Sequence, residues 1–338
     1  MNNSITALIV SALIVIISGP FVIPLLRKLK LGQHEREEGP QSHKVKAGTP
    51  SMGGIMIIVA LAAGVLLPVI FPLFGDGGDE IQFILPSLLV TVGFGLVGFL
   101  DDFIKVKMKR NLGLRAYQKL IGQFAIALIF AIYMKNTLGT SLYLPFSNRM
   151  WDLGWMYIPF AMFLIIGTVN AVNLTDGLDG LASGVTVVYS MSMAVIFLYI
   201  QRAALINGDV YFAGSGNMAT FAGATAGACL GFLTYNAYPA KVFMGDTGSL
   251  ALGGAVSAMA LMSRSALLLP IMGFWFMMSA ISVILQVGSY KLRKKRIFKM
   301  APIHHSFEMS NMSETAIVAM YMVSTCILCL ICIGAYLK

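Results

Sequence analysis

Long apolar runs with few charges recur along this chain of 338 residues, and short polar segments separate them. A helix needs roughly 20 mainly apolar residues to cross a bilayer, because the hydrocarbon layer is about 30 Å thick. The runs reach that length, whereas the strands of a membrane barrel would alternate polar and apolar residues in stretches of about 10. The pattern therefore predicts an all-α, polytopic integral membrane protein, with a single transmembrane domain over residues 1–338.

Ten candidate spans follow from these runs. They lie near residues 4–26, 53–74, 82–100, 117–134, 157–173, 181–201, 217–235, 248–265, 267–289 and 315–337. The eighth and ninth spans are separated only by the short turn MSRSA, so nine spans is an alternative. The first span lacks a basic leader and a small-residue cleavage site, which favours a retained helix over a signal peptide.

Composition supports the membrane assignment. Hydrophobic residues make up 57% of the chain and charged residues 12%, whereas a soluble domain has about 25% charged residues. No segment between the apolar runs is long enough to hold a soluble domain.

The charged residues are distributed unevenly across the predicted membrane. If loops alternate between sides, most of the 24 lysines and arginines lie in the loops after the odd-numbered spans. Basic residues are enriched in cytoplasmic loops, so this side is predicted to be cytoplasmic, with both termini outside. All four histidines and most acids in suggestive motifs lie on the same side. The predicted catalytic loops are near 27–52, 101–116, 174–180, 236–247 and 290–312.

Two carboxylate motifs stand where apolar runs end or begin. Asp101 and Asp102 are adjacent in GFLDDFIKVK, and such a pair suits a metal ligand or a general base at the membrane surface. Asp246 stands in FMGDTGS, just before the eighth span. A solvated helix end would also explain the first motif, and ordinary helix capping would explain the second.

A third acidic motif, NAVNLTDGLDG, follows the fifth span. Asp176 and Asp179 would share a face if the helix continued through them. Gly177 and Gly180 instead favour a loop, or a close approach of the backbone to a ligand. With Asn173, the motif offers oxygen ligands that suit Mg²⁺, which often binds through one or two carboxylates plus substrate phosphates. An Asp/Gly turn between two helices is the alternative.

The segment MAPIHHSFE contributes two of the four histidines, His304 and His305. Neighbouring residues on a helix point about 100° apart, so the two rings cannot easily chelate one ion. Phosphate binding or proton transfer suits them better than zinc does, and a pair of surface histidines without a function is the alternative.

Other segments of the same side add cations and an aromatic ring. KVKAGTPSMGG carries Lys46 and Ser51 before the second span, but it lacks the P-loop pattern. NAYPAKVF carries Asn236 and Phe243, and an exposed aromatic ring in a polar loop can stack on a nucleobase. The cluster KLRKKR, residues 291–296, is best explained as a topology signal that also attracts anionic lipid headgroups.

Together these motifs predict phosphoryl-transfer chemistry at one membrane surface. Such a site needs Mg²⁺ to neutralise phosphate charge and donors to position the phosphates. One reactant would be a soluble nucleotide diphosphate and the other a lipid phosphate presented by the bilayer. The residues alone do not name the transferred sugar.

The same motifs resemble those of a known superfamily. In chain order, KAGTPSMGG, the DD pair, NAVNLTDGLDG, FMGDTGS and PIHH-x-FE are similar to those of the polyprenyl-phosphate N-acetylhexosamine-1-phosphate transferases. Within that superfamily the pattern resembles the phospho-MurNAc-pentapeptide transferase family of bacterial peptidoglycan synthesis. The motifs run from residue 44 to residue 308, and the resemblance covers essentially the whole chain.

The resemblance implies a reaction and a location. The reaction is Mg²⁺-dependent transfer of phospho-MurNAc-pentapeptide from UDP-MurNAc-pentapeptide to undecaprenyl phosphate, which releases UMP and gives lipid I. The location is the bacterial plasma (inner) membrane, with a cytoplasmic active site. No nucleic-acid partner is expected, and a homodimer is a family expectation.

The resemblance also implies residue roles. Asp246 would be the principal Mg²⁺ ligand, and Phe243 would stack on uracil. Asp101 and Asp102 would supply the base that acts on the lipid phosphate, or the nucleophile of a two-step reaction. The other matched residues are the catalytic candidates His304 and His305 and the substrate-binding candidates Lys46, Ser51, Asn173, Asp176, Asp179 and Asn236.

One position departs from the family pattern, because Ser306 stands where the family usually has a third histidine. Either that histidine is dispensable or the serine hydroxyl replaces it as a donor. A transferase that uses UDP-N-acetylglucosamine is an alternative within the superfamily. A transporter or lipid flippase is an alternative from another class, but it would predict ionisable groups near the membrane midplane and an internal repeat. Acids gathered on one face favour an enzyme.

Overall fold

The structure is a computed structural model that describes residues 2–29, 48–70, 81–108, 113–147, 149–208 and 214–336. Long helices match each of the predicted apolar runs. They are α1 (Asn2–Lys28), α2 (Gly54–Ile70), α3 (Ile81–Lys107), α4 (Ala116–Leu138), α5 (Tyr157–Thr175), α6 (Leu181–Asn207), α8 (Gly216–Asn236), α9 (Gly245–Met262), α11 (Phe274–Arg293) and α13 (Glu314–Tyr336). The shorter elements are β1 (Ser141–Leu144), β2 (Arg149–Asp152), η3 (Gly154–Met156), η4 (Ala266–Leu268), α10 (Leu269–Met272) and α12 (Ile303–Glu308).

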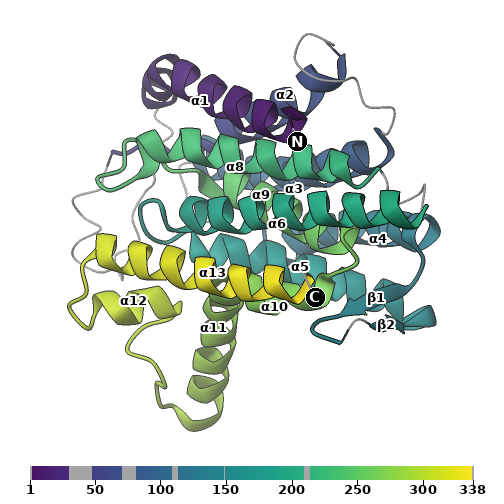
Figure 1. Ribbon diagram of the computed structural model, residues 1–338. Coiled ribbons are helices and arrows are strands. Elements are labelled where there is room, and N and C mark those ends of the chain that lie inside the picture. The colour runs from purple at the N-terminus through teal and green to yellow at the C-terminus, as the bar shows by residue number, and fades with distance from the viewer. Residues whose placement is uncertain are drawn as a thin grey trace.

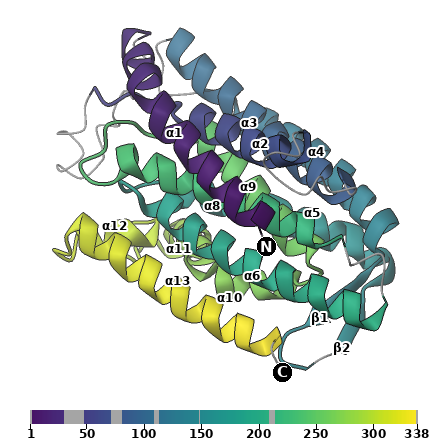
Figure 2. The same cartoon turned by 45° about the horizontal axis from the view of Figure 1, so that its top comes forward.

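Helix α9 lies at the centre of the bundle. All of its residues except Asp246 are buried, and it packs against α2, α3 and α5. Helices α1, α8, α6 and α13 lie side by side along one flank in this order (Figure 1), and the rotated view keeps the same order (Figure 2). The centre of the molecule is therefore a helix made largely of small residues, enclosed by larger apolar helices.

Two glycines hold the start of α9 tightly against its neighbours. A Cβ atom on Gly98 of α3 would lie 2.1 Å from the carbonyl oxygen of Asp246, and one on Gly54 of α2 would lie 2.2 Å from the Cα of Gly248. Only glycine permits such close backbone contact. These contacts bring Asp246 within reach of the carboxylates at the end of α3.

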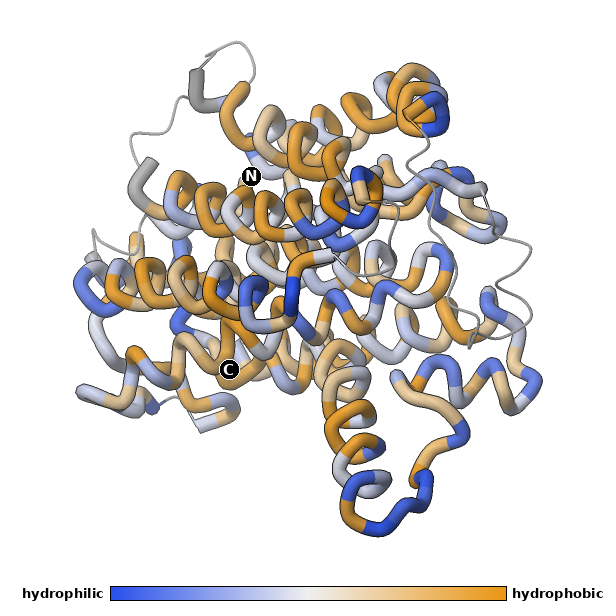
Figure 3. The backbone as a smooth tube through the Cα atoms, turned by 180° about the vertical axis from the view of Figure 1, so that it is seen from behind, coloured by the Kyte–Doolittle hydropathy of each residue, from blue (hydrophilic) through white to orange (hydrophobic). Residues whose placement is uncertain are grey.

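Many of the helices are suited to a membrane. In the part of the chain that the structure describes, seven helices are long and apolar enough to cross it, or eight if the bent pair before Arg293 forms one span. Helix α2 is a shorter apolar helix, and α9 is not among the seven because its small residues and Asp246 make it less apolar. Most of the helical tube is orange in Figure 3, and the loop at the far end of α11 is blue. The protein is thus a multi-pass, all-α membrane protein, and ten spans remain a prediction.

Two features differ from the helical pattern that the sequence predicts. A two-stranded antiparallel hairpin, β1 and β2, lies between α4 and α5. The ninth predicted span breaks at Gly273, where α11 turns by 81° from the segment 266–272. Pro270 lies in the first turn of the short α10, and since proline favours a helix start over a helix interior, the apolar run does not form one straight helix.

Candidate active site

Asp101 and Asp102 lie on α3, which continues to Lys107 instead of ending near residue 100. Both carboxylates are buried. Asp102 Oδ2 accepts hydrogen bonds from the backbone N–H of Thr247 at 2.9 Å and from its hydroxyl at 2.8 Å. Asp101 Oδ1 accepts one from the backbone N–H of Leu114 at 2.8 Å. The DD pair is therefore fixed between the start of α9 and the segment before α4.

Asp246 completes a cluster of three carboxylates. One oxygen from each of Asp101, Asp102 and Asp246 lies within 4.8 Å of the other two. Asp246 Oδ1 accepts a hydrogen bond from the side-chain amide of Asn173 on α5 at 2.8 Å, and the same amide contacts Ser249 Oγ at 2.8 Å. Residues from α3, α5 and α9 that are far apart in sequence thus meet at one point. The structure thus brings these three carboxylates and Asn173, all predicted site residues, together.

Two lysines neutralise part of this cluster. Lys105 Nζ lies 2.6 Å from Asp101, 3.6 Å from Asp102 and 2.9 Å from Asp246. Lys119 Nζ, from α4, lies 2.9 Å from the same Oδ2 of Asp246. Three carboxylates and two ammonium groups thus lie together in one partly buried site. The ammonium groups suit the binding of phosphate groups, and the carboxylates suit the binding of cations.

Sequence reasoning did not single out these two lysines. Lys105 follows Asp101 by four residues and Asp102 by three. Residues at this spacing are neighbours on a helix, so the sequence could have indicated these ion pairs. Lys119 carried no such signal, because its contact with Asp246 depends on how α4 lies beside α9.

The loop of residues 176–180 joins α5 to α6, so the alternative of a loop is correct and the continued helix is wrong. Helix α5 ends at Thr175, and Asp176 follows at its C-terminal cap. Asp176 is half-buried. Burial raises the pKa of Asp176 to about 8, and the negative charges of Asp246, Asp102 and Asp179 add to the shift.

Asp179 and Asn236 hold neighbouring loops together through backbone groups. Asp179 Oδ2 accepts the N–H of Ala240 at 2.9 Å, and its own N–H donates to Glu314 Oε1 at 2.5 Å. Asn236 Oδ1 accepts from the N–H of Gly180 at 3.1 Å, while its amide donates to the carbonyl of Val242 at 3.0 Å. These contacts position the loops. Glu314 was not identified from the sequence as the acceptor for the Asp179 N–H.

The segment of residues 50–53 runs beside Phe243. Phe243 donates its N–H to the carbonyl of Pro50, and Gly53 donates its N–H to the carbonyl of Phe243, both at 2.8 Å. The Phe243 ring is half-buried, so the prediction of an exposed ring is wrong: this backbone pairing holds the residue against the bundle. A Cβ on Gly245 would lie 2.7 Å from Ser51 Oγ, which places the Ser51 hydroxyl near the cluster. Lys46 lies outside the described residues.

The two histidines of α12 are buried, so the alternative of a surface pair is wrong. Their ring centroids are 4.3 Å apart. His304 faces the 176–180 loop, because a Cβ on Gly177 would lie 2.2 Å from His304 Nε2. His305 Nδ1 lies 2.6 Å from Glu308 Oε2, an ion pair when the ring is protonated.

Ser306 serves the backbone of its own segment. Its hydroxyl donates to the carbonyl of Met300 at 2.8 Å and accepts from the N–H of Met300 at 3.2 Å. Both bonds close the turn that leads into α12. This position therefore stabilises the turn that presents the two histidines.

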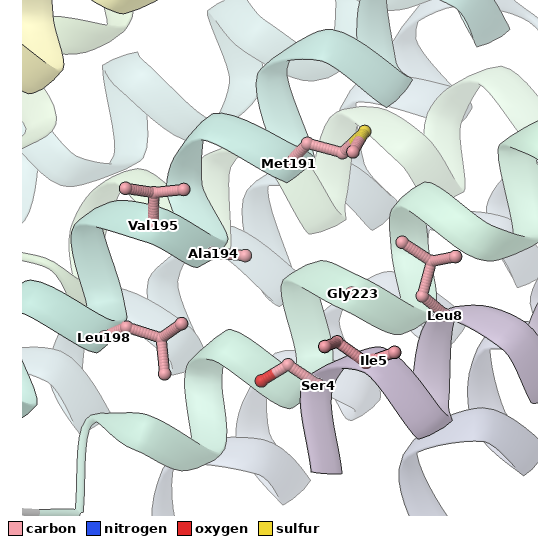
Figure 4. Close-up of a pocket in the computed structure, with 8 residues that line it drawn as sticks. All are labelled: Ser4, Ile5, Leu8, Met191, Ala194, Val195, Leu198 and Gly223. Atoms are coloured by element: carbon pink, nitrogen blue, oxygen red, sulfur yellow. The ribbon is translucent and has the colours of Figure 1, made fainter. Parts of the chain in front are cut away.

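The carboxylate cluster fits a divalent cation. Carboxylate oxygens are the ligands that Mg²⁺ prefers, usually one or two of them together with substrate phosphates. Asp101, Asp102 and Asp246 supply such oxygens, and one from each lies within 4.8 Å of the other two. The apolar pocket drawn in Figure 4 offers no such ligands. It is lined by residues of α1, α6 and α8 such as Leu8, Val195 and Leu198 and contains none of these carboxylates.

Comparison with known proteins agrees with this chemistry. The profile of glycosyl transferase family 4 matches residues 84–264. A second profile, phospho-N-acetylmuramoyl-pentapeptide-transferase signature 1, matches residues 46–58.

Curated relatives match almost the whole chain. The phospho-N-acetylmuramoyl-pentapeptide-transferase of Caldicellulosiruptor bescii is 46% identical over 98% of this chain and 97% of its own. The proteins of the same name from Heliobacterium modesticaldum and Clostridioides difficile are 49% and 48% identical, over 94% and 98% of this chain and 93% and 96% of their own. The chain therefore belongs to the phospho-N-acetylmuramoyl-pentapeptide-transferase family, within glycosyl transferase family 4, and is a membrane-embedded transferase.

Proposed function

We propose that the protein transfers phospho-MurNAc-pentapeptide from UDP-MurNAc-pentapeptide to undecaprenyl phosphate, giving lipid I and UMP. The observation that carries this proposal is the cluster of Asp101, Asp102 and Asp246, which Lys105 bridges and Lys119 contacts at Asp246. The names of the relatives describe the transferred group. A site that neutralises and positions phosphates is what such a transfer needs.

The residues suit Mg²⁺ as the cofactor, with Asp246 as the principal ligand and Asp101 and Asp102 beside it. When bound, the ion would neutralise charge on the transferred phosphate and on the departing UMP. The support is the oxygen-only set of carboxylates and their spacing. Asn173 would orient Asp246, since its amide already donates to Asp246 Oδ1.

The proposed chemical step is an in-line displacement. An oxygen of the lipid phosphate attacks the β-phosphorus of the UDP-sugar, a new P–O bond forms, and the bond to the α-phosphate oxygen breaks to release UMP. Asp101 or Asp102 takes up the proton of the lipid phosphate. Lys105 and Lys119 supply positive charge where negative charge develops, which is a large contribution in a partly buried site.

The surrounding residues would bind the nucleotide and the sugar. Phe243 would stack on uracil, with Ser51 and Lys46 on the segment before α2. His304 and His305 would contact phosphate or sugar groups from α12. Asp179 and Asn236 would act mainly through loop position, since both hold backbone groups of the loops around the site.

The membrane arrangement is also proposed. The ten long helices would form ten spans in the bacterial plasma membrane, with both termini outside and the carboxylates at the cytoplasmic surface. The excess of lysine and arginine in the loops on that side supports this orientation. A soluble nucleotide donor would then reach the site from the cytosol.

The test is release of UMP by the purified protein in detergent with UDP-MurNAc-pentapeptide, undecaprenyl phosphate and Mg²⁺. Parallel reactions omit the lipid, omit the metal, or contain UDP-N-acetylglucosamine as the donor. Release that requires both lipid and metal and prefers the pentapeptide donor would support the proposal. Release only with UDP-N-acetylglucosamine would assign the protein to the other branch of the superfamily, and no release with either donor would contradict the proposed reaction.

A further inference from the structure

The β1–β2 hairpin and η3 carry an exposed apolar surface at the end of the bundle away from the carboxylates. We call it the hairpin surface; it consists of Phe146 (56% exposed), Met150 (49%), Trp151 (51%), Trp155 (80%) and Met156 (43%). We propose that this surface lies in the boundary layer between lipid headgroups and acyl chains, in the leaflet opposite the carboxylate cluster.

The length of α5 sets the distance between the two sites. Trp155 stands just before α5, and Asn173 stands near its other end. A helix rises about 1.5 Å per residue, so this helix of 19 residues is about 28 Å long, close to the hydrocarbon thickness of about 30 Å. Figure 1 accordingly places the strands and α12 at opposite ends of the bundle. If the carboxylates are at one membrane surface, the hairpin surface is at the other.

The hairpin surface is suited neither to water nor to the hydrocarbon layer. Met150 pairs with Tyr143 and Trp151 with Leu142, and since neighbouring residues of a strand point to opposite faces, β2 exposes large apolar side chains on both. So many large apolar side chains exposed on one short hairpin are unfavourable in water. The outer edge of β2, however, presents backbone polar groups that need partners and exclude it from hydrocarbon.

The boundary layer satisfies both requirements. Tryptophan is enriched there because its ring is apolar and its N–H is a hydrogen-bond donor. Arg149 on β2 and Lys135 in the last turn of α4 are exposed and would provide positive charge for lipid phosphates. The surface also continues the outward-facing apolar side chains of α4 and α5, such as Ile129 (70% exposed) and Phe163 (79%), which would face acyl chains.

The hairpin is tied to the end of α9, the helix that carries Asp246, and is closed by bonds of its own. Tyr143 donates its N–H to the carbonyl of Arg264, just after α9, at 2.9 Å, and Leu153 donates to the carbonyl of Thr140 at 3.1 Å. Asp152 accepts from the hydroxyl of Thr140 and from the N–H of Gly154. The two indoles are therefore held at a fixed height relative to α4, α5 and α9.

Tryptophan fluorescence in vesicles tests the proposal, because the chain has three tryptophans: Trp151, Trp155 and Trp275. Trp275 is partly buried, where it stacks on Tyr321 and donates to Ser324, so W275F isolates the hairpin signal and W151F/W155F isolates the control. Each variant is reconstituted in phosphatidylcholine vesicles that contain lipids brominated either near the headgroup or near the chain end. Transferase activity relative to wild type checks that each variant is folded.

We expect the fluorescence of W275F to fall at least twofold with the headgroup-proximal bromine and less with the chain-end bromine. The W151F/W155F variant should lose less than W275F with the headgroup-proximal bromine. If W275F folds poorly, subtraction of the W151F/W155F signal from the wild-type signal gives the same quantity. Quenching by aqueous iodide without any effect of bromolipid would place the hairpin surface in water and overturn the proposal. Stronger quenching by the chain-end bromine would place it in hydrocarbon, which would also overturn it.

Discussion

At the scale of single residues, Lys105 and Lys119 reach the same oxygen of Asp246 from two different helices, each at 2.9 Å. Their ammonium groups offset three closely spaced negative charges that would otherwise repel one another. The sequence predicts the acids of this cluster, since isolated carboxylates beside apolar runs are conspicuous. It does not predict Lys119, whose role depends on the packing of α4.

Replacement of Lys119 by methionine tests its contribution with little change in shape. Because the variant removes one of the two positive charges on Asp246, we expect kcat/KM for UMP release to fall by about 100-fold, the usual effect of deleting one electrostatic group in a site. Lys135 lies on the same helix at the end away from the site, so Lys135→Met is the matched control and should retain activity. Equal activity of the two variants would contradict the role of Lys119.

Asp176 provides a test of stability against pH. Its pKa is raised to about 8 by burial and neighbouring acids, whereas an aspartate in an unfolded chain titrates near 3.9. Between these values the folded protein holds a proton that the unfolded chain releases, so this group lowers stability progressively as the pH rises through the window. Asp176→Asn removes that loss.

The measurement is the Tm of wild type and Asp176→Asn in detergent with EDTA. The Tm of the variant minus that of wild type should increase from about pH 5 to about pH 8 and change little at higher pH. A difference that stays constant across this range would show that Asp176 titrates near its ordinary value.

At the scale of elements, the site depends on how three loops are tied together. The N–H of Asp179 donates to Glu314 at the start of α13, and the Asp179 carboxylate accepts from Ala240 after α8. The loop between α5 and α6 is thus linked to two other segments of the chain. The segment between α8 and α9, which contains Phe243, is held by the bond from Ala240 to Asp179 and by the bond from the Asn236 amide to the carbonyl of Val242.

Glu314→Ala and Glu314→Gln separate the role of the hydrogen-bond acceptor from that of the charge. The alanine variant leaves the Asp179 N–H without this acceptor, so we expect kcat/KM to fall by about tenfold, mainly through a higher KM for the nucleotide donor. Glutamine keeps the acceptor oxygen and should restore most of the activity. Thr315→Ala, on the neighbouring exposed residue, is the control. Equal losses in the alanine and glutamine variants would indicate that the charge matters and the acceptor does not.

The elements differ in how well the sequence predicts them. Apolar periods and lengths predict the long helices correctly, since burial in lipid or protein selects such runs. The hairpin at residues 141–152 was missed because each strand has only four residues, too few for a clear alternation of polar and apolar positions. The bend at Gly273 was missed because composition alone does not reveal a break inside an apolar run. Contacts such as those of Lys119 and Glu314 depend on tertiary packing, which a single sequence does not give.

At the scale of the whole molecule, the carboxylate cluster and the hairpin surface lie at opposite ends of α4, α5 and α9. This separation predicts opposite sides of the membrane for positions near each end. Ser310 is exposed after α12, and Arg149 is exposed on β2. Neither lies among the residues assigned to the chemistry, so both tolerate labelling.

Cysteine accessibility tests that arrangement. The variants Ser310→Cys and Arg149→Cys are treated with a membrane-impermeant maleimide in spheroplasts before and after lysis. We expect Arg149→Cys to react in intact spheroplasts and Ser310→Cys to react only after lysis, with the unmodified protein and its native cysteines as the background. The same accessibility for both positions, or the reverse order, would contradict the proposed topology.

The central claim is that the cluster around Asp246 transfers a phosphosugar to a lipid phosphate. The most direct measurement is mass spectrometry of the lipid product made by purified wild type and by Asp246→Asn, with UDP-MurNAc-pentapeptide, undecaprenyl phosphate and Mg²⁺. We predict an undecaprenyl diphosphate that carries MurNAc-pentapeptide with wild type, and about 100-fold less of it with the variant. A wild-type yield of this lipid from Asp246→Asn, or its absence with wild type, would contradict the claim.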